Sequence, residues 1–132
     1  MNKVHFTSQR QNWKTPLKFY EELNKEFGFN YDPCPSNYLL DGLLTPWGTR
    51  SFCNPPYSKI KDWVKKAYEE SLNGKLVVML IPSRTDTIWW HDYIMKADEI
   101  RFIKGRLKFD EHKNSAPFPS AIIVFRSKVV EQ

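Results

Sequence analysis

The chain has 132 residues, of which 41% are hydrophobic and 27% charged, and its net charge is +5. This length fits one small domain with a real core, so we expect a single domain over residues 1–132. No apolar run approaches the ~20 residues that span a bilayer, and Met1–Phe6 lacks the apolar stretch of a signal peptide. We therefore expect a cytoplasmic protein without membrane contact.

The basic charge and the 15% of aromatic residues suit a nucleic-acid partner, because cations meet phosphates and rings stack on bases. Many basic proteins bind no nucleic acid, so composition leaves the partner open. Cys34 and Cys53 lack metal-ligand spacing, and the three histidines are scattered. We therefore expect no metal and two reduced, structural thiols.

The predicted elements begin after a polar N-terminal arm at residues 1–14. Thr15–Pro16 indicates a helix start, with a hydroxyl cap followed by proline at the first helical position. Apolar residues then recur at helical spacing until Gly28. A short strand is expected at residues 29–31, and the prolines that follow Asp32 end it.

The rest of the chain alternates between strand and helix signals. The expected elements, in chain order, are a loop at 36–50, a strand at 51–53, a helix from about Ser58 to Gly74, a strand at 76–81, a helix capped by Thr85 or Asp86 with Ile88, Trp89, Tyr93 and Ala97 inward, a strand at 100–103 extended by 107–109, a loop at 110–119 and a strand at 121–125. This order predicts an α/β fold with a mainly parallel sheet and a C-terminal antiparallel strand pair. The helix tryptophans are assigned to the core or to a partner surface.

The tetrapeptide Asn54-Pro55-Pro56-Tyr57 carries the chemistry. It follows a predicted strand, and ligand sites of open α/β sheets lie outside the carboxyl ends of strands. The prolines remove two amide donors, which leaves the Asn54 side-chain oxygen and the Pro55 carbonyl as acceptors beside the Tyr57 ring. These groups suit a flat ligand that carries an amino group.

Such a site explains how a poor nucleophile can react. The lone pair of the adenine amine is delocalised into the ring, and two acceptors that hold its hydrogens favour a tetrahedral nitrogen. While Tyr57 holds the ring, the amine can attack a sulfonium methyl in line, so that most of the catalytic effect is positioning. The alternative is a rigid turn, because Asn and Pro are common in turns.

Beyond the tetrapeptide, the chain resembles the phage-type DNA N6-adenine methyltransferases, often called Dam, over about residues 6–126. The tetrapeptide matches the (Asp/Asn/Ser)-Pro-Pro-(Tyr/Phe/Trp) motif of S-adenosylmethionine-dependent amino methyltransferases. The other landmarks, in the family's order, are Trp13–Pro16, Tyr31–Cys34, Asp41–Leu43, Cys53–Ser58, Gly105–Phe109 and Ala116–Ser120. The resemblance implies an enzyme that uses S-adenosylmethionine to methylate the N6 amine of adenine in DNA.

The resemblance also implies which residues form the site, with the tetrapeptide as the catalytic group. The implied cofactor contacts are Trp13, Thr15, Pro16, Asp32, Pro33, Cys34 and Asp41. The implied DNA contacts are Ser58, Arg84, Arg106, Lys108, Phe109 and Phe118, with Lys104 as a further cation. Each has a plain alternative: the acids as turn or loop residues, the cations as ordinary surface charges and the phenylalanines as core.

One departure from the pattern concerns the cofactor. The glycine-rich loop of other methyltransferases is absent, and only 21 residues separate Asp32 from Asn54, too few for the usual two strand–helix units. We therefore expect a compact, truncated Rossmann-like methyltransferase fold. Either the sheet has lost its leading units, or Asp32 belongs to the second strand and the first is missing.

Other functions stay open at this point. The same motif could act on an RNA base, on cytosine N4 or on a protein glutamine, since all present a planar amino group. A different alternative is a nucleic-acid-binding module that has kept the fold and lost catalysis. The family's usual association is with protection from restriction, and the sequence does not predict the oligomeric state.

Overall fold

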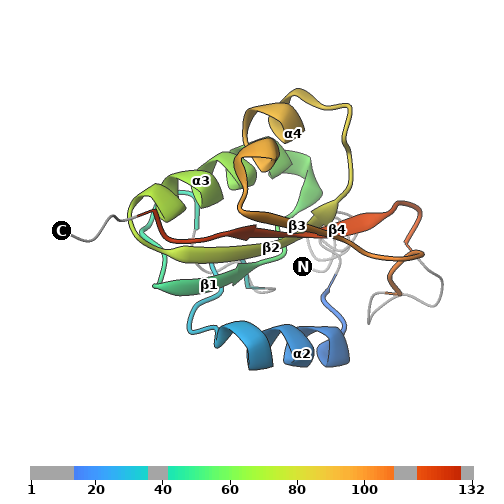
Figure 1. Cartoon of the computed structure of the whole chain (residues 1–132), viewed down its shortest axis with the longest axis horizontal. Coiled ribbons are helices and arrows are strands. Elements are labelled where there is room, and N and C mark those ends of the chain that lie inside the picture. Colours follow the sequence, from blue (N-terminus) through green and yellow to red (C-terminus); the bar gives the residue numbers. More distant parts are fainter. Residues whose placement is uncertain (1–13, 36–41, 109–115, 129–132) are drawn as a thin grey trace, which may run out of the picture.

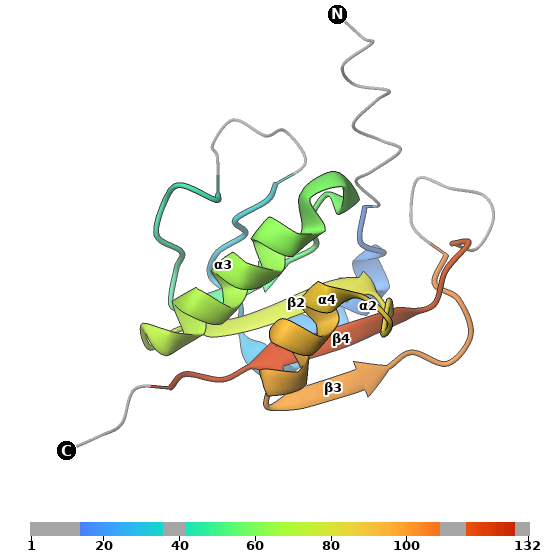
Figure 2. The same ribbon diagram turned by 90° about the horizontal axis from the view of Figure 1, so that it is seen from above.

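The computed structural model describes residues 14–35, 42–108 and 116–128 (Figure 1). These residues form three layers, in which a four-stranded sheet carries α2 on one face and α3 and α4 on the other (Figure 1, Figure 2). The elements in chain order are α2 (Leu17–Phe27), β1 (Arg50–Cys53), the 3-10 turn η1 (Tyr57–Lys59), α3 (Ile60–Leu72), β2 (Leu76–Pro82), α4 (Ile88–Asp92), the 3-10 turn η2 (Ile94–Lys96), β3 (Glu99–Phe102) and β4 (Ser120–Phe125). The predicted α/β class is confirmed. All but one residue of the predicted N-terminal arm lie outside the described ranges.

The sheet is mixed, so the prediction of a mainly parallel sheet is wrong. Its strand order is β1-β2-β4-β3, with β1 parallel to β2 and β4 antiparallel to both of its neighbours. The predicted C-terminal antiparallel pair, β3 with β4, is confirmed. An apolar run such as residues 121–125 carries no directional signal, so its insertion between β2 and β3 could not be seen in the sequence. As a consequence of this order, β1, β2 and β3 all run in the same direction.

The two central strands are buried on both faces. Every residue of β2 and β4 is buried. Val77, Met79 and Ile81 pack with side chains of α3 and α4, whereas Val78 and Leu80 pack with side chains of α2. The central strand predicted at residues 76–81 is therefore confirmed.

The helix α2 begins one residue later than predicted. Pro16, with an extended ψ of 133°, is the N-cap residue, and its own side chain makes no capping hydrogen bond. The predicted Thr15 cap is therefore wrong. At the other end Gly28 has a φ of 65°, the left-handed conformation that favours glycine, and the predicted stop is confirmed.

The helix after β2 is short and also starts later than predicted. Thr87 is its N-cap rather than Thr85 or Asp86, and the Thr87 hydroxyl accepts a hydrogen bond from the Trp90 N–H at 3.3 Å. Ile88, predicted to face inward, is 74% exposed, because a five-residue helix offers only part of the expected face. The helix tryptophans assigned to the core are buried, namely Trp63, Trp89 and Trp90.

Two short predicted segments form less structure than expected. Tyr31 makes a single parallel bridge to Ser51, so residues 29–31 lie beside β1 without forming a full strand. Residues 107–108 do not extend β3, and the Leu107 carbonyl instead accepts from the Ala116 N–H at 2.8 Å.

In the described ranges no helix is long and apolar enough to cross a membrane. The same ranges hold no group of three or more His, Cys, Asp or Glu residues that could bind a metal ion. Cys34 and Cys53 are buried and form no disulfide with each other.

Candidate active site

Chain segments that are far apart in the sequence meet at one edge of the sheet. Because β1, β2 and β3 run in the same direction, their carboxyl ends lie at this edge, where β4 also begins. The Ser83 N–H donates to the Pro119 carbonyl at 2.9 Å, and the Ile103 N–H donates to the Ser120 carbonyl at 3.1 Å. This edge therefore gathers Asn54 after β1, the residues after β2 and β3, and the segment before β4, as expected for the ligand edge of an α/β sheet.

Asn54 is held in place by a residue from before α2. Its side chain is 8% exposed, and its Nδ2 donates to Thr15 Oγ1 at 2.9 Å. Pro55 and Pro56, which follow, are also buried. The hydrogen bond fixes the amide with its nitrogen toward Thr15, so the oxygen is the end that can accept from a substrate amine.

Tyr57 opens the turn η1 and is half-buried. Its ring meets the ring of Phe118 edge-on, with 5.3 Å between centroids and an interplanar angle of 76°. Phe118 itself is 7% exposed and belongs to the core on the α2 side of the sheet. Burial raises the pKa of Tyr57, although the charge of Arg84 opposes this shift, so the phenol keeps its proton at neutral pH.

Asp32 lies at the same edge, directly after the bridge that Tyr31 forms with β1. The side chain is exposed, and its Oδ1 accepts from the Cys34 N–H at 2.9 Å. Partial desolvation by the surrounding chain raises the pKa of Asp32, against the effect of that hydrogen bond. Burial and, next, the charge of Asp32 raise the pKa of Tyr20, so the carboxylate lies near α2.

The loop next to Asp32 is tightly packed. Pro33 and Cys34 are buried, so their side chains contribute to the core more than to an open surface. A Cβ added to Gly42 would lie 2.1 Å from the Pro33 carbonyl oxygen, so only glycine allows this approach. Gly42 thus lies directly against the backbone of the predicted cofactor segment Asp32–Cys34.

The remaining predicted site residues fall into two groups. Trp13, Asp41 and Phe109 lie outside the described residues. The second group consists of predicted DNA contacts whose side chains are exposed, as contact with DNA requires: Ser58, Arg84, Lys104, Arg106 and Lys108.

Sequence reasoning missed the pairing of Thr15 with Asn54. Thr15 was interpreted as a helix cap and a cofactor contact, and no local pattern links residues that are 39 positions apart. It also missed a set of buried hydroxyls at this edge that have no hydrogen-bond partner in the described part of the chain: Tyr57, Ser83 and Ser120.

The fold and the site together define an α/β protein with a polar, aromatic candidate site at the carboxyl edge of its sheet. The family described as "DNA N-6-adenine-methyltransferase (Dam)" matches residues 4–129, so the chain belongs to this family of DNA-methylating enzymes.

Two curated relatives, both from phages, are similar to this chain. One is a DNA N-6-adenine-methyltransferase of Escherichia phage T1, 35% identical over 114 residues, which cover 76% of this chain and 48% of that protein. The other is a DNA N-6-adenine-methyltransferase of Haemophilus phage HP1, 28% identical over 141 aligned positions, which cover 92% of this chain and 82% of that protein. The alignment thus spans about half of the length of the T1 relative. No solved structure matches the chain significantly.

Proposed function

We propose that this chain transfers a methyl group from S-adenosylmethionine to the N6 amine of adenine in DNA. The observation that supports this most directly is the hydrogen bond of Asn54 to Thr15, at the carboxyl edge of the sheet. It orients a buried amide beside a tyrosine ring, which is what a planar amine needs from its site.

In this proposal Asn54 and Pro55 act on the substrate amine and Tyr57 acts on its ring. The Asn54 Oδ1 and the Pro55 carbonyl accept the two amine hydrogens and so favour a nitrogen lone pair that can react. Tyr57, supported edge-on by Phe118, stacks on the base and helps to offset the few kcal/mol that its removal from the duplex costs. When bound, the methyl donor supplies an electrophilic methyl group on a sulfonium.

The residues around Asp32 fit the donor. The exposed Asp32 carboxylate can accept hydrogen bonds from ribose hydroxyls or from the donor's amine, and it lies close to α2. The N-terminus of α2, at Pro16, is the positive end of the helix dipole and favours the donor's carboxylate. Trp13 and Asp41 belong to the same proposed contact set through the family resemblance.

We extend the proposal to the architecture. The position of Tyr31 next to β1 supports a Rossmann-like sheet that has lost its units between Asp32 and β1, over a single catalytic domain at residues 1–132. The cations exposed at the carboxyl edge, including Arg84 and Arg106, bind DNA phosphates. In a phage setting the enzyme works in the bacterial cytoplasm and protects DNA from restriction.

The test is to express the protein, digest the host DNA to nucleosides and measure N6-methyladenine by mass spectrometry. The wild type should produce an excess, and Asn54→Ala should remove it while leaving folding and DNA affinity mostly intact. Calorimetry with S-adenosylmethionine at about 100 µM protein supplies a second measurement. Near-wild-type turnover by Asn54→Ala, or no heat with or without DNA, would refute the proposal.

A further inference from the structure

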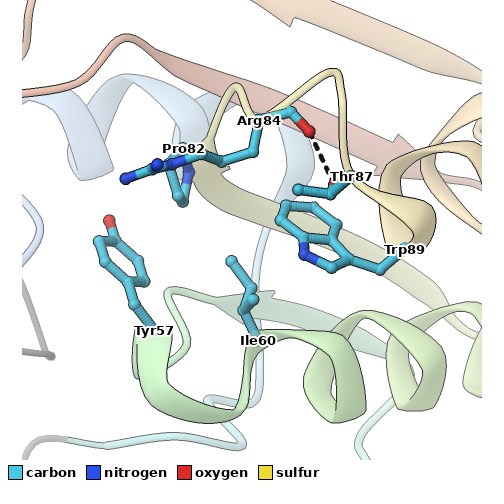
Figure 3. Close-up of a pocket in the computed structure, with 6 residues that line it drawn as sticks. All are labelled: Tyr57, Ile60, Pro82, Arg84, Thr87 and Trp89. Carbon is cyan, nitrogen blue, oxygen red and sulfur yellow. Dashed lines mark hydrogen bonds between the residues drawn. The ribbon is translucent and has the colours of Figure 1, made fainter.

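A pocket of about 210 Å³ lies beside the proposed catalytic ring (Figure 3). Its walls come from the start of α3, the end of β2 and the segment that leads into α4. The lining residues are Tyr57, Ile60, Pro82, Arg84, Thr87 and Trp89. Asn54 is not among them, so the pocket adjoins the proposed reaction site and shares Tyr57 with it. The proposed function already counts Arg84 among the cations that bind DNA phosphates, but it leaves the rest of this pocket without a role.

A guanidinium and a phenolic hydroxyl meet at the pocket, and neither is hydrogen-bonded to the other. Figure 3 shows the guanidinium end of Arg84 next to the Tyr57 hydroxyl. Neither side chain has a hydrogen-bond partner in the described part of the chain. The Thr87 hydroxyl does not supply the acceptor, because it donates to the Arg84 carbonyl at 2.7 Å and accepts from the Trp90 N–H. One acceptor oxygen placed between Arg84 and Tyr57 could bind both donors.

The charge of Arg84 makes no structural contact of the kind that Arg50 and Arg101 make. The Arg50 Nε donates to the Phe27 carbonyl at 2.6 Å, and Arg101 binds Glu26 and Glu99. Arg84, in contrast, is exposed and forms no ion pair with any described residue. An anionic oxygen therefore suits the pocket better than a neutral one. The wall of Ile60, Pro82 and Trp89 adds an apolar surface beside this anion position.

We infer that this pocket binds one phosphate–deoxyribose unit of the DNA strand that carries the target adenine. Arg84 and the Tyr57 hydroxyl bind the phosphate, and the wall of Ile60, Pro82 and Trp89 covers the sugar. This inference rests on the proposed function. A backbone unit fits better than a second base, because no further base has to leave the duplex. Tyr57 then contacts the flipped base with its ring and the neighbouring backbone with its hydroxyl, which sets the register of the strand.

The experiment is a scan of duplexes that each carry one neutral methylphosphonate link near the target adenine. For the wild type, one position should weaken binding and raise KM about tenfold or more, the scale of a hydrogen bond to a charged group. Arg84→Ala should bind unmodified DNA with a similar loss of affinity, and a methylphosphonate link at that position should weaken its binding no further. Tyr57→Phe, which removes only the hydroxyl, should show a reduced sensitivity there. Arg106→Ala, the matched control, should keep the full effect at that link.

If Arg84→Ala and the methylphosphonate links weaken binding additively at every position, the subsite is wrong. Because affinity is measured together with turnover, the two proposals are tested separately. If the wild type is active but no methylphosphonate link has an effect that disappears in Arg84→Ala, the subsite alone is overturned. If the wild type is inactive but one methylphosphonate link weakens its DNA binding only while Arg84 is present, the proposed methylation is refuted and the DNA backbone subsite is supported.

Discussion

At the scale of single residues, the contact between Thr15 and Asn54 shapes the site more than any other described feature. An amide has two ends of opposite hydrogen-bonding character, and only the oxygen can accept from a substrate amine. The Thr15 hydroxyl, 2.9 Å from the Asn54 nitrogen, fixes which end is which. Thr15 is therefore a positioning residue for the proposed reaction.

We expect Thr15→Val to lower kcat about tenfold, because the isosteric side chain cannot accept the hydrogen bond and the amide loses its fixed orientation. KM for DNA should change little, since Thr15 does not contact the duplex in this proposal. Steady-state kinetics on a defined duplex measure both. Thr15→Ser is the matched control and should retain activity. A wild-type kcat for Thr15→Val would show that the contact does not orient Asn54.

The tetrapeptide could be predicted from sequence because its residue types and its place after a strand are local features. Its supports could not be predicted, because they depend on tertiary packing. Thr15 comes from before α2 and Phe118 from the segment before β4, and neither has a sequence pattern that names its partner. Family resemblance named both residues but assigned them other roles.

At the scale of elements, α2 is fixed at its C-terminal end by charged groups of the sheet. Arg101 of β3 binds both oxygens of Glu26, at 2.7 and 2.5 Å, and its guanidinium lies 5.3 Å from the centre of the Phe27 ring. Thr15 lies just before the other end, so α2 connects this ion pair with the edge where Asn54 lies.

We expect Arg101→Met to destabilise the fold by about 1 kcal/mol, since the ion pair is bidentate but partly exposed. Hydrogen exchange should show faster opening of the last turn of α2. Lys25→Met provides the control within the same helix, because its pair with Glu22 is 3.7 Å long and about three-quarters exposed. Equal exchange rates in the two variants would mean that Arg101 does not hold the helix.

Glu70 performs a similar anchoring role for the loop before β1. Its carboxylate is buried and accepts from Lys66 at 3.0 Å, from Lys75 at 2.9 Å and from the Trp47 N–H at 3.3 Å. Lys75 also donates to the Trp47 carbonyl at 2.6 Å. The cluster thus ties α3, the start of β2 and the loop that ends at β1.

Glu70→Ala should cost about 3 kcal/mol of unfolding free energy, because it leaves two partly buried cations without their partner. Urea denaturation measures this loss. The neighbouring Glu69 is exposed, and Glu69→Ala should be close to neutral. If both variants unfold at the same urea concentration, the cluster does not stabilise the fold.

At the scale of the whole molecule, carboxylates with lowered pKa values determine acid stability. Burial would raise the pKa of Glu70, but its hydrogen bonds from Lys75, Lys66 and Trp47 lower it, and hydrogen bonds from Arg101 lower the pKa of Glu26 and Glu99. Below the ordinary value of 4.5 the unfolded chain binds protons that the folded chain does not. These groups therefore stabilise the fold above that pH.

Unfolding free energy should fall as the pH drops from about 5 through 4.5 toward 3. Urea titrations at a series of pH values measure the slope, and Glu70→Ala should show a shallower one. Asp32, whose pKa is raised, acts in the opposite sense but is a single group. A stability that is flat between pH 5 and pH 3 would contradict the role of these ion pairs.

The class of the fold and its central strand could be predicted, because buried runs and helical spacing leave local signals. Residues 76–81 showed the continuous apolar run of a strand covered on both faces, and the structure confirms it. The direction and place of β4 could not be predicted, since strand pairing is decided between segments that are distant in the chain. The helix α4 was predicted, but its start was placed too early, because its cap, Thr87, lies in a segment with three candidate cap residues.

The position of β4 also governs how the protein is made. During synthesis β2 and β3 leave the ribosome before β4, the strand that lies between them in the sheet, because residues 120–125 are translated later. Until then, the edges of β2 and β3 that pair with β4 have no partner strand. Phe118, the support of Tyr57, emerges only just before them. A nascent or prematurely stopped chain therefore has neither a complete sheet nor the ring contact between Phe118 and Tyr57. It instead presents an apolar strand edge to chaperones and to other nascent chains.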